Sequence, residues 1–168
     1  HGLGGYYIGT RQYGLAIEHY LKAREGLPDD AGNETMVIGQ CYMDWGNPER
    51  AEIFLREAML LLVEQRNMDQ YAGCLMGLGE IALRRGDAGT ALDHFRAMRP
   101  YWSILPPINM GIARTRFVEA YIRTNQLDSA RAELLALDTM RTGGRLALWT
   151  TAGECEVDFT NYLYQKAI

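Results

Sequence analysis

The sequence has few cysteines and few prolines, with three and five in 168 residues. Cys41, Cys74 and Cys155 are an odd number at long intervals, and no Cys-x-x-Cys pair occurs. This spacing indicates neither a disulfide framework nor a redox pair, and a 19.0 kDa chain is large enough to form a core without covalent links. We therefore interpret the three cysteines as small buried hydrophobic residues.

The chain also lacks a basic excess and a long apolar run. It carries 17 Lys and Arg against 21 Asp and Glu, a net charge of −4. That balance argues against a nucleic-acid surface, which is usually basic. The longest wholly apolar run, residues 59–63, is far shorter than the roughly 20 residues that span a bilayer. With no visible signal peptide, the sequence predicts a cytoplasmic chain without a membrane span.

A helical repeat runs through most of the sequence. Each instance has an alanine followed four residues later by a large hydrophobic residue, which places both on one helix face. The alanines are Ala16, Ala51, Ala91 and Ala130, at intervals of 35, 40 and 39 residues. Four matched instances predict four equivalent helices.

Each of these helices has a predecessor with its own pattern. A large residue stands thirteen positions before each alanine and is followed in three cases by glycine. The pairs are Leu3-Gly4, Ile38-Gly39, Leu78-Gly79 and the degraded Phe117-Val118. Glycine lets a neighbouring helix approach closely, which accounts for part of the high glycine content of 18 residues.

The turns between the two helices have readable cap residues. Gly46 suits the left-handed position after a helix, and Asn47 and Pro48 suit the start of the next one. Gly86-Asp87 repeats this arrangement, and Asn125 takes the left-handed position in the fourth unit. Because no period-2 run suggests a strand, these signals predict an all-α chain of antiparallel helix pairs.

The chain resembles a tetratricopeptide-repeat protein, whose motif pairs a large-Gly-x-x-Tyr helix with an Ala-x-x-x-aromatic helix and a closing Pro. The first unit carries Leu3, Gly4, Tyr7, Ala16, Tyr20, Ala23 and Pro28. The resemblance implies one domain over 1–168, a right-handed α-solenoid of about four antiparallel helix pairs plus C-terminal helices. The expected units are 1–30, 32–67, 72–103 and 107–140, with 142–168 as a cap or partial fifth unit. Since Leu3 already stands inside a helix, we expect residues upstream of His1.

In such repeats the first helices line a concave groove, so the resemblance implies a binding surface there. Methionine adapts to irregular partners, and mixed charge at one edge suits an amphipathic helix or an extended peptide. The expected groove residues are Met36, Gln40, Met43, Asp44, Met76, Glu80, Arg84, Thr115, Arg116, Glu119 and Arg123. The alternative is that Met36 and Met76 simply pack between neighbouring units.

The segment 99–107 departs from the repeat because Pro100, Pro106 and Pro107 interrupt helical continuation. Its aromatic and aliphatic residues, among them Trp102 and Leu105, form either a docking patch or a hydrophobic staple over the junction. We favour the staple.

No catalytic constellation stands out. The sequence contains no Ser/His/Asp or Cys/His order, no phosphate loop and no HExxH helix, and His19 and His94 are equivalent positions in two units. We therefore expect no enzyme, no cofactor and no metal. The leading hypothesis is a module that binds a protein or peptide through the groove. The alternative is a ligand- or peptide-sensing segment of a larger bacterial regulator, because the long repeats are similar to those of maltose-regulator-type transcription activators. Self-association through the solenoid ends is a third hypothesis.

Overall fold

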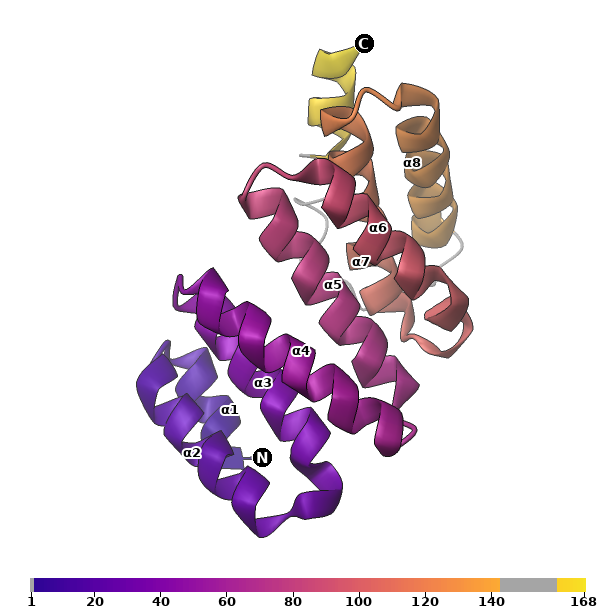
Figure 1. Cartoon of the computed structure of the whole chain (residues 1–168). Coiled ribbons are helices and arrows are strands. Elements are labelled where there is room, and N and C mark those ends of the chain that lie inside the picture. Colours follow the sequence, from indigo (N-terminus) through magenta and orange to yellow (C-terminus); the bar gives the residue numbers. More distant parts are fainter. Residues whose placement is uncertain (1, 143–159) are drawn as a thin grey trace. The chain divides into compact units, whose positions relative to one another are not determined.

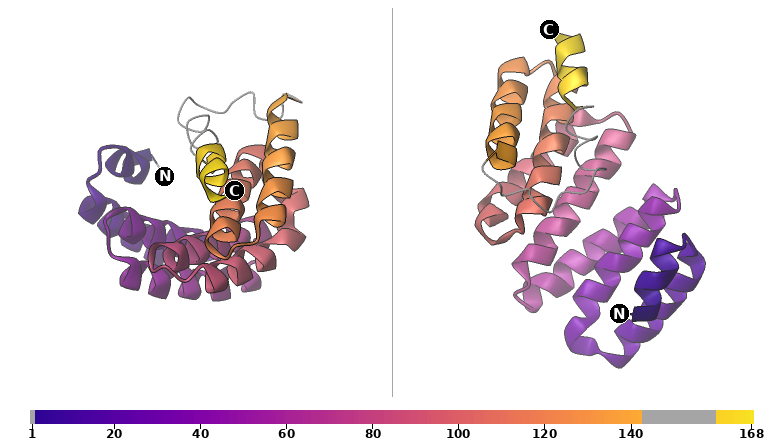
Figure 2. Two further views of the ribbon diagram at one scale, coloured as in Figure 1. Left: turned by 90° about the horizontal axis from the view of Figure 1, so that it is seen from above. Right: turned by 180° about the vertical axis from the view of Figure 1, so that it is seen from behind.

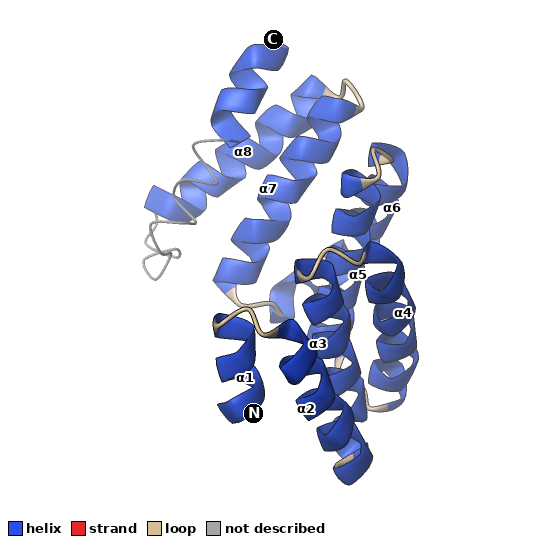
Figure 3. Cartoon of the chain, turned by 90° about the vertical axis from the view of Figure 1, so that its left-hand side faces the viewer, coloured by secondary structure: helices blue, strands red, loops and turns tan. Residues whose placement is uncertain are grey.

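The computed structural model describes residues 2–142 and 160–168, and every element in these ranges is helical (Figure 3). Consecutive helices are joined by short turns and pack side by side, as expected for a helical-repeat solenoid. The predicted all-α fold class is confirmed. Of the expected cap or partial fifth unit over 142–168, residues 143–159 lie outside the described residues, whereas residues 160–167 are helical.

The chain divides into two compact units, residues 1–81 and 82–168. The first four α-helices and a 3-10 helix belong to the first unit (Figure 1). They are α1 (Gly2–Gly9), α2 (Tyr13–Gly26), η1 (Pro28–Asp30), α3 (Ala31–Asp44) and α4 (Pro48–Glu64). Helix α5 (Met68–Arg84) begins in the first unit and ends in the second.

The second unit contains the later helices, and the C-terminal helical residues 160–167 lie in it as well (Figure 2). Its elements are α6 (Ala88–Met98), η2 (Arg99–Ile104), α7 (Pro107–Arg123) and α8 (Leu127–Thr142). Tyr164 packs on the same hydrophobic core as α6 and α7.

The predicted turn chemistry is confirmed at three turns. Gly46 and Gly86 have φ angles of +85° and +82°, and Asn125 has +57°. The Asn47 side chain accepts a hydrogen bond from the Arg50 backbone N–H at 3.1 Å, and Asp87 caps α6 in the same way. At each turn two backbone N–H groups return to carbonyls of the preceding helix, which satisfies its last turn.

The same turn also forms where neither glycine nor asparagine stands at the left-handed position. Arg11 and Arg66 both have φ of +57°, and the backbone N–H of the residue after each one donates to a carbonyl five positions earlier. A left-handed arginine costs backbone energy that glycine does not. The hydrogen bonds and the packing of the flanking helices therefore impose this geometry.

The core of the first unit is held together by close helix approach. Leu55, on α4, is 1% exposed and packs in one cluster with residues of α2, α3 and α5. A methyl group at Gly39 would lie 2.9 Å from Leu55 Cγ and 3.2 Å from the Leu55 backbone nitrogen. The glycine therefore has the predicted role, because only a residue without a side chain allows this contact.

The core of the second unit is aromatic. Phe117 is completely buried, and its ring centroid lies 5.5 Å from Phe95, 5.9 Å from Trp102 and 5.7 Å from Tyr121. Trp102 comes from η2, where it covers the junction between α6 and α7, and Leu105 is also buried. These contacts are those of the favoured hydrophobic staple.

Candidate functional site

The exposed face of α3 carries two of the expected groove residues. Gln40 and Asp44 stand four positions apart on this helix and are both exposed. The Gln40 Nε2 atom donates a hydrogen bond to Asp44 Oδ1 at 3.1 Å. The pair presents an amide and a carboxylate together, and these groups suit hydrogen bonding to a peptide backbone.

Met36 lies one turn before Gln40 and has a mixed environment. It is half-buried and packs against the core of the first unit. A methyl group at Gly73 of α5 would lie 3.4 Å from the Met36 sulfur, so α3 and α5 are neighbours here. Met76 and Glu80 of α5 are half-buried as well. Met36 therefore has the packing role of the alternative interpretation and also keeps part of its surface exposed.

Two expected groove residues are not available to a ligand. Met43 is 2% exposed and belongs to the core cluster, and Thr115 is 1% exposed. The Thr115 hydroxyl donates to the Ile112 carbonyl at 2.6 Å, so its polar group is satisfied inside α7. The expectation was wrong for these two side chains because neighbouring helices cover a wider arc of each first helix than the repeat pattern alone indicates.

Three of the five expected residues of the second unit form a charged row on α7. Glu119 lies between Arg116, at 3.7 Å, and Arg123, at 2.6 Å. Arg123 also donates from Nη1 to the Leu83 carbonyl of α5 at 2.7 Å, and thereby caps the end of that helix. Arg84, the last residue of α5, is exposed. The row combines structural ion pairs with exposed guanidinium groups.

The expected groove residues thus form two groups, one in each compact unit. Those of the first unit are Met36, Gln40, Met43, Asp44, Met76 and Glu80, and those of the second are Arg84, Thr115, Arg116, Glu119 and Arg123. A continuous groove across both groups stays a prediction.

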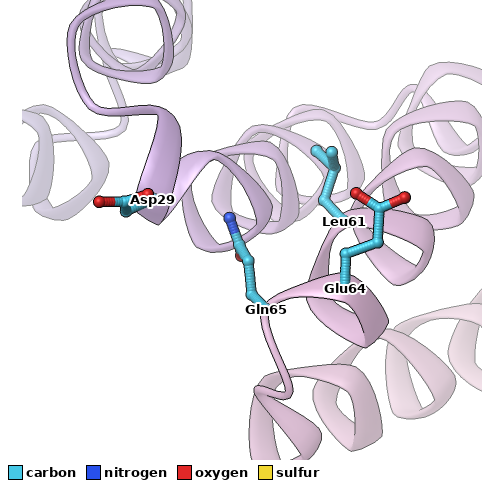
Figure 4. Close-up of a pocket in the computed structure, with 4 residues that line it drawn as sticks. All are labelled: Asp29, Leu61, Glu64 and Gln65. Carbon is cyan, nitrogen blue, oxygen red and sulfur yellow. The ribbon is translucent and has the colours of Figure 1, made fainter.

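A pocket of about 380 Å³ opens in the first unit, away from these residues. It is lined by Asp29 of η1 and by Leu61, Glu64 and Gln65 near the end of α4. In Figure 4 Gln65 lies between Asp29 and Glu64, and the two carboxylates do not converge on one point. This arrangement is unlike a cation site, in which carboxylate oxygens meet around the ion.

A second pocket, of about 270 Å³, lies in the second unit. Residues of α8 and of the C-terminal helix line it together. They are Arg131, Leu134, Leu135, Asp138, Asn161, Tyr164 and Gln165. The sequence interpretation did not single out these residues, because their proximity depends on how the C-terminal helix packs.

The buried thiols are not suited to nucleophilic chemistry. Burial raises the pKa of Cys41 to about 11, with a further contribution from Asp44, and burial raises the pKa of Cys74 to about 12. Both are free and belong to the first core, as the hydrophobic interpretation expects. Cys155 lies outside the described residues. Among the residues with a described position, no group of three potential ligands could hold a metal ion.

The most concentrated polar cluster of the second unit was missed by the sequence interpretation. Glu133 of α8 is 5% exposed and accepts hydrogen bonds from Arg99 and Arg114. The Arg99 and Arg114 guanidinium groups also lie 4.9 and 4.4 Å from the Trp102 ring centroid. A signal was available, because Glu133 stands three residues after Ala130 on the packing face of its helix.

Within the part of the chain that the structure describes, no helix combines the length and the apolar character needed to cross a membrane.

Comparison with known families gives a match within the first unit. Residues 36–61 match the family model of the tetratricopeptide repeat, and this range covers most of α3, the turn at Gly46 and most of α4. No curated protein matches the chain. The match agrees with the repeat pattern and with the helix pairs, and it supports the tetratricopeptide-repeat resemblance.

Proposed function

We propose that this tetratricopeptide-repeat chain is an interaction module that binds a peptide or helix of a partner protein along the first helices of its repeats. The family match supports protein interaction in general, because this repeat is typically a non-catalytic interaction element. The finer proposal is that the partner lies along α3 and α5, where Gln40, Asp44, Met76 and Glu80 are exposed or half-buried.

The observation that carries this proposal is the composition of the exposed strip on α3. It combines an amide–carboxylate pair at 3.1 Å with a half-buried methionine one turn away. Such a strip offers hydrogen bonds to a peptide backbone and a deformable apolar contact to its side chains. The charged row Arg116, Glu119 and Arg123 on α7 is the corresponding expected surface of the second unit.

The test begins with selection of binding peptides from a random library on the whole chain. Their affinity is then measured against the variant Gln40→Arg/Glu80→Arg, which changes two residues of the expected surface and leaves Met36 in the core contact. We expect at least about a tenfold loss of affinity. The matched control is Glu18→Arg on the exposed face of α2, which should leave the affinity unchanged. Equal affinities for both variants would contradict the proposed surface.

A second candidate is a sensing segment of a larger bacterial regulator. The observation that favours it is the repeat interval of 40 and 39 residues in the later units, which is longer than the 34 residues of the standard repeat. A regulator of this kind would act in the cytoplasm, which is the location that the sequence predicts. Reading the full open reading frame tests it, since a regulator requires an output domain in the same chain.

A further inference from the structure

The outer face of α4 differs from the equivalent faces of the other second helices. Ile53 and Leu60 on this face are 63% and 72% exposed. Counted from the repeat alanines, the positions of Ile53 are Glu18, Asp93 and Ala132 in the other units, and those of Leu60 are Glu25, Pro100 and Thr139. Large aliphatic residues at these two positions are therefore a property of α4 among the four repeats.

Two opposite charges stand between the aliphatic residues. Ile53, Arg56, Glu57 and Leu60 are spaced at i, i+3, i+4 and i+7, so they share one face of the helix. All four are exposed. Along the helix the order is apolar, positive, negative, apolar. Read from the opposite end, the order is apolar, negative, positive, apolar, which is the complement of the first.

The charged pair is not fixed to its present partners. Arg56 lies 2.8 Å from Glu52 of its own helix, and Glu57 lies 3.0 Å from Arg24 of α2. The Arg56 and Glu57 side chains keep 59% and 47% of their surface exposed. Exposed ion pairs of this kind contribute little to stability, so both side chains can exchange partners at small cost.

We propose that α4 is a self-association surface on which a second copy of this chain packs its own α4 in antiparallel orientation. A two-fold axis between Arg56 and Glu57 places Ile53 opposite Leu60 of the second copy and Arg56 opposite Glu57 of the second copy. Each contact then occurs twice, as an isologous interface requires. This surface is separate from the expected groove and does not rest on the proposed function.

The same register places Glu49 and Glu64, seven residues outside the central pair, near each other at the ends of the contact. Packed helices cross at an angle, so positions two turns from the crossing point diverge and this like-charge pair is well separated. The productive contact is therefore confined to about two turns of each helix. An interface of this size is below the standard range, and we expect a dimer that forms at concentrations on the order of 100 μM.

The first test measures the mass of the whole chain by sedimentation equilibrium from 10 μM to 1 mM. We expect a reversible monomer–dimer equilibrium. The double variant Ile53→Glu/Leu60→Glu gives α4 the residues that α2 has at these positions, so it should fold, and we expect it to remain monomeric over the whole range. A wild-type chain that is monomeric at 1 mM overturns the proposal, and so does a dimer that the double variant leaves intact.

The second test examines the register by charge reversal. Arg56→Glu and Glu57→Arg each place like charges opposite one another. Each should therefore raise the dissociation constant by about fivefold or more. The combined variant Arg56→Glu/Glu57→Arg restores opposite charges and should return the constant to within about twofold of the wild type. A combined variant as weak as the single ones overturns the antiparallel register.

The matched control is Leu135→Glu on α8, where the leucine is 62% exposed, close to the exposure of Ile53. This change should leave the dissociation constant unchanged. If Leu135→Glu abolishes the dimer while the α4 variants do not, self-association uses another surface and the proposal is wrong. Circular dichroism of every variant verifies that it keeps the helical content of the wild type.

Discussion

The two compact units each bury a glutamate side chain, and they surround it with different groups. Glu133 in the second unit, 5% exposed, accepts hydrogen bonds from two arginines. Glu34 in the first unit is 1% exposed, and burial raises the pKa of its carboxyl, with Asp30 acting in the same direction and His19 in the opposite one. The second unit pairs its carboxyl group with two arginines, whereas in the first unit burial favours the protonated form.

The hydrophobic cores of the two units also differ in their packing. In the first unit Gly39 is pressed against Leu55, and Tyr42 stacks on Phe54 at 5.3 Å with Arg50 over the Tyr42 ring. The second relies on aromatic rings and on arginines that lie over them, as Arg99 does over Phe117 at 4.5 Å. Arginines thus lie over aromatic rings in both units, and in the second unit these arginines are also paired with a buried carboxyl group.

The largest effect is expected from Glu133→Gln. This change leaves the shape intact but removes the charge that compensates Arg99 and Arg114, so the second unit should lose about 3 kcal/mol of unfolding free energy. Urea unfolding of the whole chain gives this value, and hydrogen exchange locates the loss to α7 and α8. The control Glu57→Gln breaks an exposed pair with Arg24 and should cost less than about 1 kcal/mol. Similar losses of unfolding free energy in both variants would show that the buried cluster stabilises the chain no more than an exposed ion pair does.

A smaller effect is expected in the first unit from Gly39→Ala, and its cause is steric overlap instead of a lost charge. The added methyl group meets the Leu55 Cγ at 2.9 Å and the backbone of α4, so the change should destabilise by about 2 kcal/mol although alanine favours a helix. The control Gly77→Ala meets mainly the Leu55 Cδ1 atom, which can rotate away, and should be close to neutral. If Gly77→Ala costs as much as Gly39→Ala, close backbone approach is not the cause.

Glu34→Gln should act in the opposite direction to Glu133→Gln and stabilise the chain by about 1 kcal/mol at pH 7. Because the folded-state pKa of Glu34 is raised, its stabilising contribution is full below the unfolded pKa and is lost as pH rises through the folded pKa. The variant should lack this part of the pH dependence. Unfolding free energies measured between pH 4 and 7 for both proteins test the difference, and parallel curves would contradict it.

The smallest effect is expected at a turn. Arg66→Gly relieves a left-handed arginine at φ +57° and should stabilise the first unit by about 0.5 kcal/mol. Gly86→Ala in the second unit makes the reverse change at φ +82° and should destabilise by about 1 kcal/mol. Thermal unfolding of both variants shows whether each change stabilises or destabilises the chain. If both changes act in the same direction, the backbone conformation at these two positions is not the cause.

The local features of this chain were predictable from sequence because they depend on neighbours along the chain. Gly46, Asn47 and Gly86 define their turns by their own backbone and side-chain chemistry, and the Ala51–Leu55 spacing defines one face of α4. The same local reasoning did not predict the left-handed turns at Arg11 and Arg66, where the packing of the flanking helices imposes the geometry.

The candidate site was less predictable because it depends on contacts between distant segments. Gln40 and Asp44 are exposed as expected, but Met43 is covered by the core and Thr115 is buried in α7. Glu133 and Arg99 are 34 residues apart, so only the packing of α8 beside η2 reveals their pairing. The periodicity of a helix identifies its inner face but does not determine how wide that face is.

Helix α5 has a practical consequence for cutting this chain into pieces. Cys74, Leu78 and Ile81 belong to the core of the first unit, and Ala82 and Leu83 belong to that of the second, although all five lie on one uninterrupted helix. A cut after residue 81 would divide α5, because its last turn, with Ala82, Leu83 and the carbonyl that Arg123 caps, would stay on the second fragment. A boundary at the turn 65–67 takes Cys74, Leu78 and Ile81 from the first core, and one at the turn 85–87 takes Ala82 and Leu83 from the second. Limited proteolysis should still cut at these turns before it cuts within α5.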